Sequence, residues 1–191
     1  IAERIFAKYQ VPFFSDYRRP MTSHPVVEAI TALLEVFHAR WSYESLFALL
    51  KTDLFPISRQ EADVLENYCL AYGIQGYHWL NDTDWTYTKK RYLDETSEEG
   101  LQEKERLDTI NAIRRRVVEI LLPFWNEAQK EHDLKTWCTL LYQWLVRMQV
   151  PQTLRKWKEE HHETGQAVDE KEHEQVWKRI LLFLDEIVHV C

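Results

Sequence analysis

The sequence predicts an all-α fold, a bundle of seven or eight helices with at most one short N-terminal strand. Two observations predict it. Only four of the 191 residues are glycine, whereas average usage of roughly 7% would give about thirteen, so tight turns must be few. Apolar residues recur every three or four positions through most of the chain, which is the period of an amphipathic helix. The hydrophobic share of 45% is enough for a folded core.

The N-terminal piece differs in character from the rest. Residues 1–9 have the pattern of the last turns of a helix, and residues 11–14 (VPFF) form a short apolar run typical of a strand. This is the only run with strand character, so we expect its partner strands to lie outside the chain. Both ends of the sequence fall within regular patterns, which predicts a segment of a longer protein.

A first long helix is expected from Ser23, which can serve as the N-cap, with Pro25 in its first turn. Its apolar positions are Val27, Ile30, Leu34, Phe37 and Trp41. Ser42 can cap a second, shorter helix that stops at Pro56.

Ser58 and Glu61 have the spacing of a capping box, so a third helix is expected to begin there. Gly73 fits the left-handed residue that ends such a helix. Residues 74–88 show no clear period and are expected to form an aromatic-rich loop. Its aromatic residues are Tyr77, Trp79, Trp85 and Tyr87. Loop aromatics usually fill the gap between helices, although they can also stack on unpaired bases.

The second half of the chain begins with a run of charged residues. Residues 89–106 contain little apolar content and are expected to form a mobile linker. A helix then restarts at Leu107 and should break or kink at Pro123. The later helix boundaries are expected at Asp133, Pro151 and Gly165. A final amphipathic helix closes the chain.

Composition excludes several classes of function. No stretch fits the phosphate-binding patterns GxxxxGK[ST] or GxGxxG, so the chain alone has no recognisable ATP site. The three cysteines are far apart and form no CxxC pair, which argues against a zinc or iron–sulphur site and indicates a reducing, cytoplasmic compartment. No stretch is apolar enough to span a membrane. The net charge is −7, so any DNA contact must be local.

A metal site is one alternative. His132 and Asp133 match the dipeptide of HD-type phosphohydrolases, in which His78 upstream and Asp169 or Asp185 downstream would be further ligands. A dipeptide is a weak motif, and a helix N-cap also accounts for Asp133. The cysteines at apolar helix positions are interpreted as core residues and not as nucleophiles.

Two basic clusters, residues 89–91 (KKR) and 114–116 (RRR), are candidates for phosphate contacts. Three consecutive helical residues sweep about 200° of the circumference, so the three arginines cannot all face one DNA strand. A solvated charged face is the alternative interpretation of either cluster.

Several phrases of the sequence resemble the B subunit of AddAB-type bacterial ATP-dependent helicase–nucleases. These phrases are VPFFSDYRRPMTSHPVVEAI (residues 11–30), WSYESLFALLKTDL (41–54), ENYCLAYGIQGYHW (66–79) and INAIRRRVVEILLPF (110–124). The resemblance covers roughly the first two thirds of the chain, and beyond Pro123 it rests on continuity of the helical pattern.

The resemblance implies a place within a helicase fold. AddB-type subunits are similar to superfamily 1 helicases of the UvrD kind fused to a C-terminal nuclease, and in that architecture a helical insertion called 2B interrupts the second RecA-like domain. Residues 1–19 would then be the edge of the RecA-like domain, and residues 20–191 the 2B-like insertion, with its charged linker near 89–106.

The resemblance also implies a function for the parent protein. Together with an AddA-type subunit, the family unwinds and degrades double-stranded DNA ends before recombinational repair. ATP, Mg²⁺ and an iron–sulphur cluster would belong to other parts of that protein, so this segment would hold no cofactor and no catalytic residue. A stand-alone helical module for protein–protein interaction is the alternative.

In related helicases the insertion contacts duplex DNA through a glycine-bearing hairpin between helices. Residues 73–76 (GIQG) could play this part, because glycine lets backbone amides approach a phosphate closely. A simple helix C-cap and turn is the alternative. The candidate DNA-binding residues are therefore Gly73, Ile74, Gly76, Trp79, Lys89, Lys90, Arg91, Arg114 and Arg115.

Overall fold

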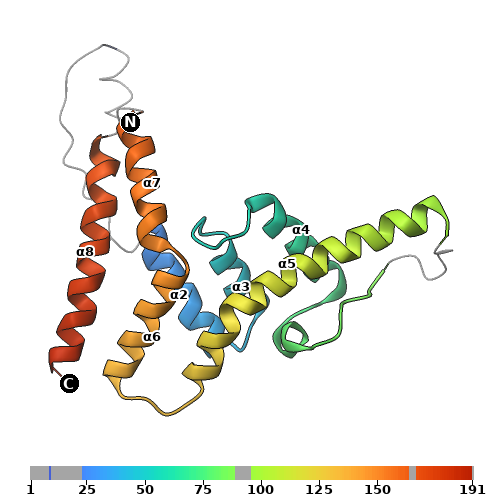
Figure 1. Ribbon diagram of the computed structural model, residues 1–191, viewed down its shortest axis with the longest axis horizontal. Coiled ribbons are helices and arrows are strands. Elements are labelled where there is room, and N and C mark those ends of the chain that lie inside the picture. The colour runs from blue at the N-terminus through green and yellow to red at the C-terminus, as the bar shows by residue number, and fades with distance from the viewer. Residues whose placement is uncertain (1–8, 10–22, 89–95, 164–166, 191) are drawn as a thin grey trace.

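The computed structural model describes residues 9, 23–88, 96–163 and 167–190. Within these ranges the chain forms seven α-helices, labelled α2 to α8, and one short 3₁₀-helix, with no strand (Figure 1). The predicted all-α bundle is confirmed. The predicted strand at residues 11–14 lies outside the described residues.

Helix α2 (Pro25–His38) begins at the expected proline, but its N-cap is His24 and not Ser23. The Nδ1 atom of His24 accepts a hydrogen bond from the Val26 amide at 3.3 Å. The same ring is buried, and its Nε2 atom lies 2.9 Å from Nδ1 of His173 on α8. The contact with His173 thus holds the His24 ring where it caps α2. The fully buried positions of α2 also lie one residue earlier than the predicted stripe, at Val26, Ala29, Leu33 and Val36.

Helices α3 (Tyr43–Leu50) and α4 (Arg59–Tyr72) begin at the predicted caps. Ser42 Oγ accepts from the Ser45 amide at 3.3 Å. The capping box is complete, because the Glu61 amide donates to Ser58 Oγ at 3.2 Å and the Ser58 amide donates to the Glu61 carboxylate at 2.8 Å. Local hydrogen bonding is sufficient to locate both helix starts.

Helix α5 (Glu98–Ala128) is a single helix of 31 residues, and this corrects two predictions. Residues 98–106 are helical and do not form a linker, while residues 89–95 lie outside the described residues. Ser97 caps the helix by accepting from the Gly100 amide at 3.1 Å. The helix also continues through Pro123, where a break or kink was expected, to Ala128.

The path of α5 through Pro123 has a local explanation. A proline at this position leaves the carbonyl of Glu119 without its helical amide donor. The guanidinium of Arg147, at the end of α6, donates to this oxygen at 3.5 Å. Leu121 and Phe124 on either side of the proline are buried in the core. Packing and a substitute donor together keep the helix intact.

Helices α6 (Leu134–Arg147), α7 (Val150–Glu163) and α8 (Ala167–Val190) form one end of the molecule (Figure 1). Asp133 caps α6 as predicted, since its carboxylate accepts from the Thr136 amide at 2.7 Å. Pro151 lies in the first turn of α7, and Gly165 lies outside the described residues. In Figure 1, α7 and α8 lie side by side, and α5 extends from the centre to the opposite end. None of the helices in the described part of the chain has the length and apolar character needed to cross a bilayer.

Aromatic side chains fill the centre of the molecule, where the C-terminal end of α2 meets α5. Trp41 is buried with its ring centroid 5.8 Å from that of Trp125 on α5. Both Arg40 and Trp41 have positive φ values, of 50° and 61°. Such backbone is costly for residues with a side chain, and burial of the Trp41 indole offsets the cost.

Candidate nucleic-acid interface

The glycine turn after α4 closes the helix and ties it to the end of α2. Gly73 has φ +65° and Gly76 has φ +62°, a conformation that favours glycine. The amides of Gly73 and Ile74 both donate to the carbonyl of Cys69, the latter at 3.0 Å. The Gly76 amide donates to the carbonyl of Trp41 at 2.8 Å. The predicted helix C-cap is confirmed, and these three amides already have acceptors within the protein.

The 3₁₀-helix η2 (Gly76–Leu80) places the first loop tryptophan in the core. Trp79 is fully buried, with its ring centroid 6.4 Å from that of Trp41 and 5.0 Å from that of Trp85. Trp85 is also buried and donates from its indole nitrogen to the carbonyl of His78 at 3.1 Å. Both rings fill the gap between helices, so Trp79 has no face available for a nucleic acid base.

Arg114, the first residue of the arginine triplet, is buried beneath the aromatic loop. Its guanidinium donates to the carbonyls of Thr83 at 2.9 Å and Trp79 at 3.1 Å, and also to that of Asn81. Its Cζ atom lies 4.8 Å from the centre of the Trp85 ring, a cation–π contact. Arg114 is therefore buried against the loop, and its guanidinium donors hold the loop in place.

Asn111, one helical turn before Arg114, pairs with the backbone of Trp85 in both directions. The Trp85 amide donates to Asn111 Oδ1 at 2.8 Å, and Asn111 Nδ2 donates to the Trp85 carbonyl at 3.0 Å. Asn111 is not among the residues predicted from the sequence. An asparagine at an inward-facing helical position, between Leu107 and Arg114, is the signal that could have found it.

Arg115 and Arg116 lie on the surface, apart from one another. Arg115 pairs with Asp84 at 2.9 Å, and Arg116 pairs with Glu61 at 2.5 Å. The fold therefore sends the three arginines in three directions, as their helical spacing requires. Residues 89–91 lie outside the described residues, so a phosphate contact by that cluster stays a prediction.

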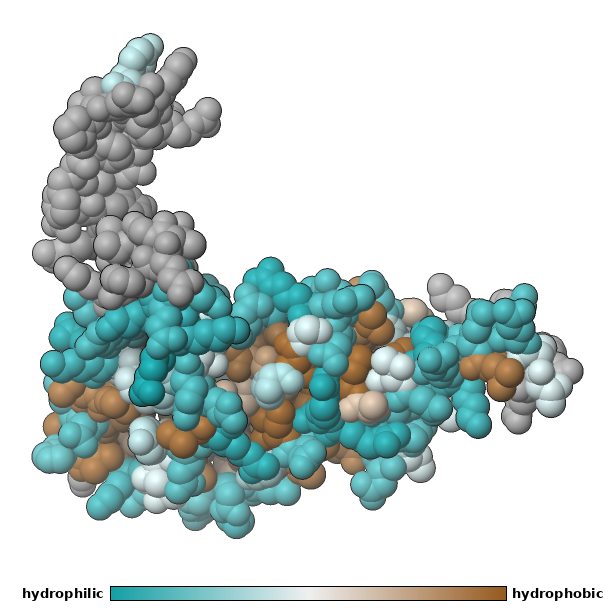
Figure 2. Space-filling view, turned by 45° about the horizontal axis from the view of Figure 1, so that its top comes forward, coloured by the Kyte–Doolittle hydropathy of each residue, from teal (hydrophilic) through white to brown (hydrophobic). Residues whose placement is uncertain are grey.

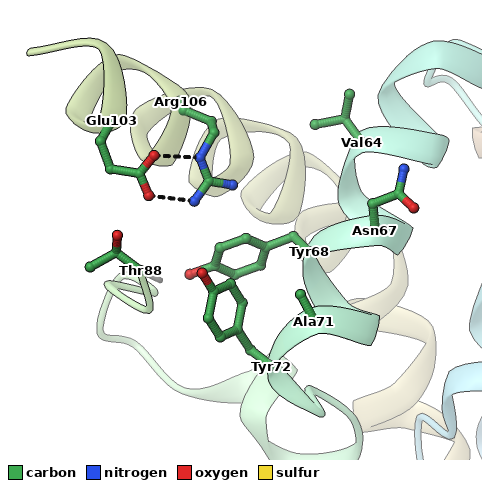
Figure 3. Close-up of a pocket in the computed structure, with 8 residues that line it drawn as sticks. All are labelled: Val64, Asn67, Tyr68, Ala71, Tyr72, Thr88, Glu103 and Arg106. Atoms are coloured by element: carbon green, nitrogen blue, oxygen red, sulfur yellow. Dashed lines mark hydrogen bonds and ion pairs between the residues drawn. The ribbon is translucent and has the colours of Figure 1, made fainter. Parts of the chain in front are cut away.

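A cavity of about 480 Å³ lies between α4 and the first turns of α5 (Figure 3). The rings of Tyr68 and Tyr72 form one wall, and the ion pair between Glu103 and Arg106 lies opposite them. The guanidinium carbon of Arg106 lies 5.4 Å from the centre of the Tyr68 ring. Burial raises the pKa of Tyr68 to about 12, so its hydroxyl stays protonated and donates to the Tyr87 carbonyl at 3.0 Å. The cavity is an aromatic cleft whose hydrogen-bonding groups are largely used internally.

The described residues do not assemble the alternative metal site. His132 Nε2 lies 2.8 Å from the carbonyl of Glu127, and Asp133 is the cap of α6. His78 lies in η2, next to Trp79. No group of three histidine, cysteine, aspartate or glutamate side chains able to hold a metal occurs in the described residues. The described residues therefore give no support to the HD-type interpretation.

The described cysteines have the environment of core residues. Cys69 is buried, and burial, reinforced by the nearby carboxylate of Glu66, raises the pKa of its thiol to about 12. A thiol with so high a pKa is a poor nucleophile at neutral pH. Cys138 is buried in α6, and Cys191 lies outside the described residues.

Comparison with known proteins gives a consistent result. No protein-family model matches the chain. Three relatives are each named as the B subunit of an ATP-dependent helicase/deoxyribonuclease. The chain is 36% identical over 184 residues to the one from Desulforamulus reducens, 35% over 188 residues to that of Clostridium botulinum (strain Loch Maree / Type A3), and 38% over 193 residues to that of Symbiobacterium thermophilum. These matches cover 96%, 98% and 98% of this chain but only 16%, 16% and 17% of the relatives. The chain thus spans about one sixth of the length of the curated relatives it matches.

Proposed function

We propose that this chain, which belongs to the AddB-type family of helicase–nuclease B subunits, is a noncatalytic helical domain of such a protein. It would help to guide double-stranded DNA ends through an ATP-dependent helicase and exonuclease that acts in recombinational repair. An AddA-type subunit would be its partner in the complex. The ATP, magnesium and iron–sulphur sites would lie in other parts of the protein.

One observation carries the proposal. Nearly the whole chain matches a segment, about one sixth in length, of proteins named as B subunits of an ATP-dependent helicase/deoxyribonuclease. The described residues contain no group of side chains able to hold a metal, and the described thiols are buried in the core. A helical domain of this kind, within a protein of that name, suits a role in positioning other parts of that protein.

The proposed DNA contact involves fewer residues than the set predicted from the sequence. Trp79 and Arg114 are buried, and the amides of Gly73, Ile74 and Gly76 have internal acceptors, so the proposed contact leaves these residues out. Arg115, which is exposed, and the basic residues at 89–91 remain as candidates. The overall charge of −7 confines phosphate binding to such a local patch.

The test is DNA-end binding by the complete complex of the AddB-type and AddA-type proteins. One variant carries Lys89→Ala, Lys90→Ala and Arg91→Ala, and a matched control carries Arg155→Ala, Lys156→Ala and Lys158→Ala on α7. Both remove three positive charges, so the comparison separates the effect of the place of the charge from the effect of total charge. The α7 control also removes two exposed ion pairs, of Lys156 with Glu160 and of Lys158 with Glu174, which contribute little to stability. The first should weaken binding and lower the salt dependence of log Kd by about one for each phosphate that the variant no longer binds.

The two variants also define the result that would overturn the proposed contact. If both change the affinity equally, long-range charge accounts for the effect and residues 89–91 do not contact DNA. If neither changes it at moderate salt, guidance of DNA by this cluster is wrong.

A further inference from the structure

Helix α8 carries one continuous apolar seam along its length. Its members are Val176, Ile180, Phe183, Ile187 and Val190. They alternate in steps of four and three residues, the spacing with which one helix presents a single stripe to a partner helix. His173, one step earlier, continues the stripe and contacts the ring of Trp157 on α7 at 5.6 Å between centroids.

The seam is buried in its first half and more exposed in its second. Val176 and Ile180 are 4% and 6% exposed, and α8 packs against both α6 and α7. Phe183 is 60% exposed and Val190 is 87% exposed, whereas Ile187, which lies between them on the same stripe, is half-buried. The α7 helix has 14 residues and α8 has 24, so α7 is too short to cover the whole seam.

Helix α6 also exposes apolar side chains. It begins at the end of the molecule where α8 finishes (Figure 1). Its first residue, Leu134, is 55% exposed, and Tyr142 and Val146 further along the helix are also exposed. Figure 2 shows brown, hydrophobic side chains reaching the surface in several places over this end. A contiguous exposed apolar patch marks an interaction site.

We propose that the more exposed second half of the α8 seam binds an apolar face from another part of the same AddB-type polypeptide. The inference rests on the proposed function, since it takes the chain to be one part of a larger protein. Two observations identify this occupant. The seam continues an interface that α8 already makes within the chain, and the relatives are about six times as long as the matched segment. Most of the apolar surface of such a polypeptide therefore lies outside these residues.

The test measures how accessible the seam is in the full-length AddB-type protein. Phe183→Cys places a thiol on the more exposed half of the seam. Leu182→Cys is the matched control, because Leu182 is the adjacent residue and is 47% exposed, but it projects about 100° away around the helix. Each variant is labelled with a maleimide, and the modified peptide is quantified by mass spectrometry, so native cysteines do not interfere. In the AddB-type protein alone, the thiol at 183 should react on the order of tenfold more slowly than the thiol at 182, because only an accessible thiolate reacts.

Three outcomes would overturn the proposal. Equal labelling at both positions would show that nothing covers the seam. Protection that appears only after the AddA-type partner is added would assign the surface to that partner, and protection that depends on protein concentration would assign it to a second copy. Labelling does not require DNA or ATP, so it can fail while the DNA-binding test succeeds, and the reverse also holds.

Discussion

Arg114 shows how strongly the role of a residue depends on its place in the fold. It is 4% exposed, and its charge is stabilised by backbone carbonyls and the face of Trp85. Its neighbour Arg115 is exposed and makes a surface ion pair with Asp84. In the sequence the two residues look alike, because a run of arginines carries no sign of which one faces the loop.

Replacing Arg114 should destabilise the protein, whereas the same change at Arg115 should not. Arg114→Met leaves the carbonyls of Thr83, Asn81 and Trp79 without their donor, which should cost about 2–4 kcal/mol. Arg115→Met removes an exposed ion pair and should change the free energy of unfolding by less than about 1 kcal/mol. Urea unfolding of both variants measures the difference. Equal effects would mean that the buried hydrogen bonds do not hold the loop.

The contact between His24 and His173 makes stability depend on pH. Burial, and then repulsion from His173, lower the pKa of His24 from 6.5 to about 4. Between these values the unfolded chain binds a proton that the folded protein does not, so this contribution to stability is present above pH 6.5 and is lost as the pH falls towards 4. His24→Asn keeps a capping acceptor and should lose less stability between pH 7 and pH 5 than the wild type. An identical pH dependence in urea unfolding would contradict this assignment.

At the scale of elements, capping residues in the sequence located most helix starts, whereas tertiary contacts determined the start of α2. Ser42, Ser58 and Asp133 were predictable because each cap depends on residues within four positions. His24 was not, because its partner His173 is 149 residues away. The length of α5 was also missed. Its first turns are rich in Glu, Lys, Arg and Gln, which are good helix formers even when the charge run suggests a linker.

Replacing Pro123 measures how far packing in α5 overcomes the tendency of proline to break a helix. Pro123→Ala would restore the amide that donates to the Glu119 carbonyl, to which Arg147 now donates at 3.5 Å. Replacing a proline in a helix interior should stabilise the folded protein by up to about 3 kcal/mol. The variant also gives the unfolded chain more conformational freedom, which offsets about 1 kcal/mol of that gain. The free energy of unfolding should therefore rise by about 1–2 kcal/mol. A decrease in stability would show that the proline shapes α5 and is not merely tolerated.

For the whole molecule, the fold class and the family were predictable from the sequence, whereas the candidate DNA surface was not. Few glycines and helical spacing predicted the all-α class, and the phrases shared with AddB-type proteins predicted the family. The candidate DNA surface was harder to predict, because burial separates residues of identical chemical type. Trp79 and Tyr77 are two positions apart in one loop, yet one is fully buried and the other is exposed. Only the packing of the loop against α5 decides between them.

The central claim is that these residues position other parts of the helicase–nuclease complex and take no part in catalysis. The most direct test is the double variant His132→Ala and Asp133→Asn in the complete helicase–nuclease complex, because this pair is the strongest catalytic candidate in the sequence and Asn preserves the helix cap. Rates of ATP hydrolysis and DNA-end degradation should stay within about twofold of the wild type. A fall on the order of a hundredfold, as expected for loss of a catalytic group, would contradict the claim.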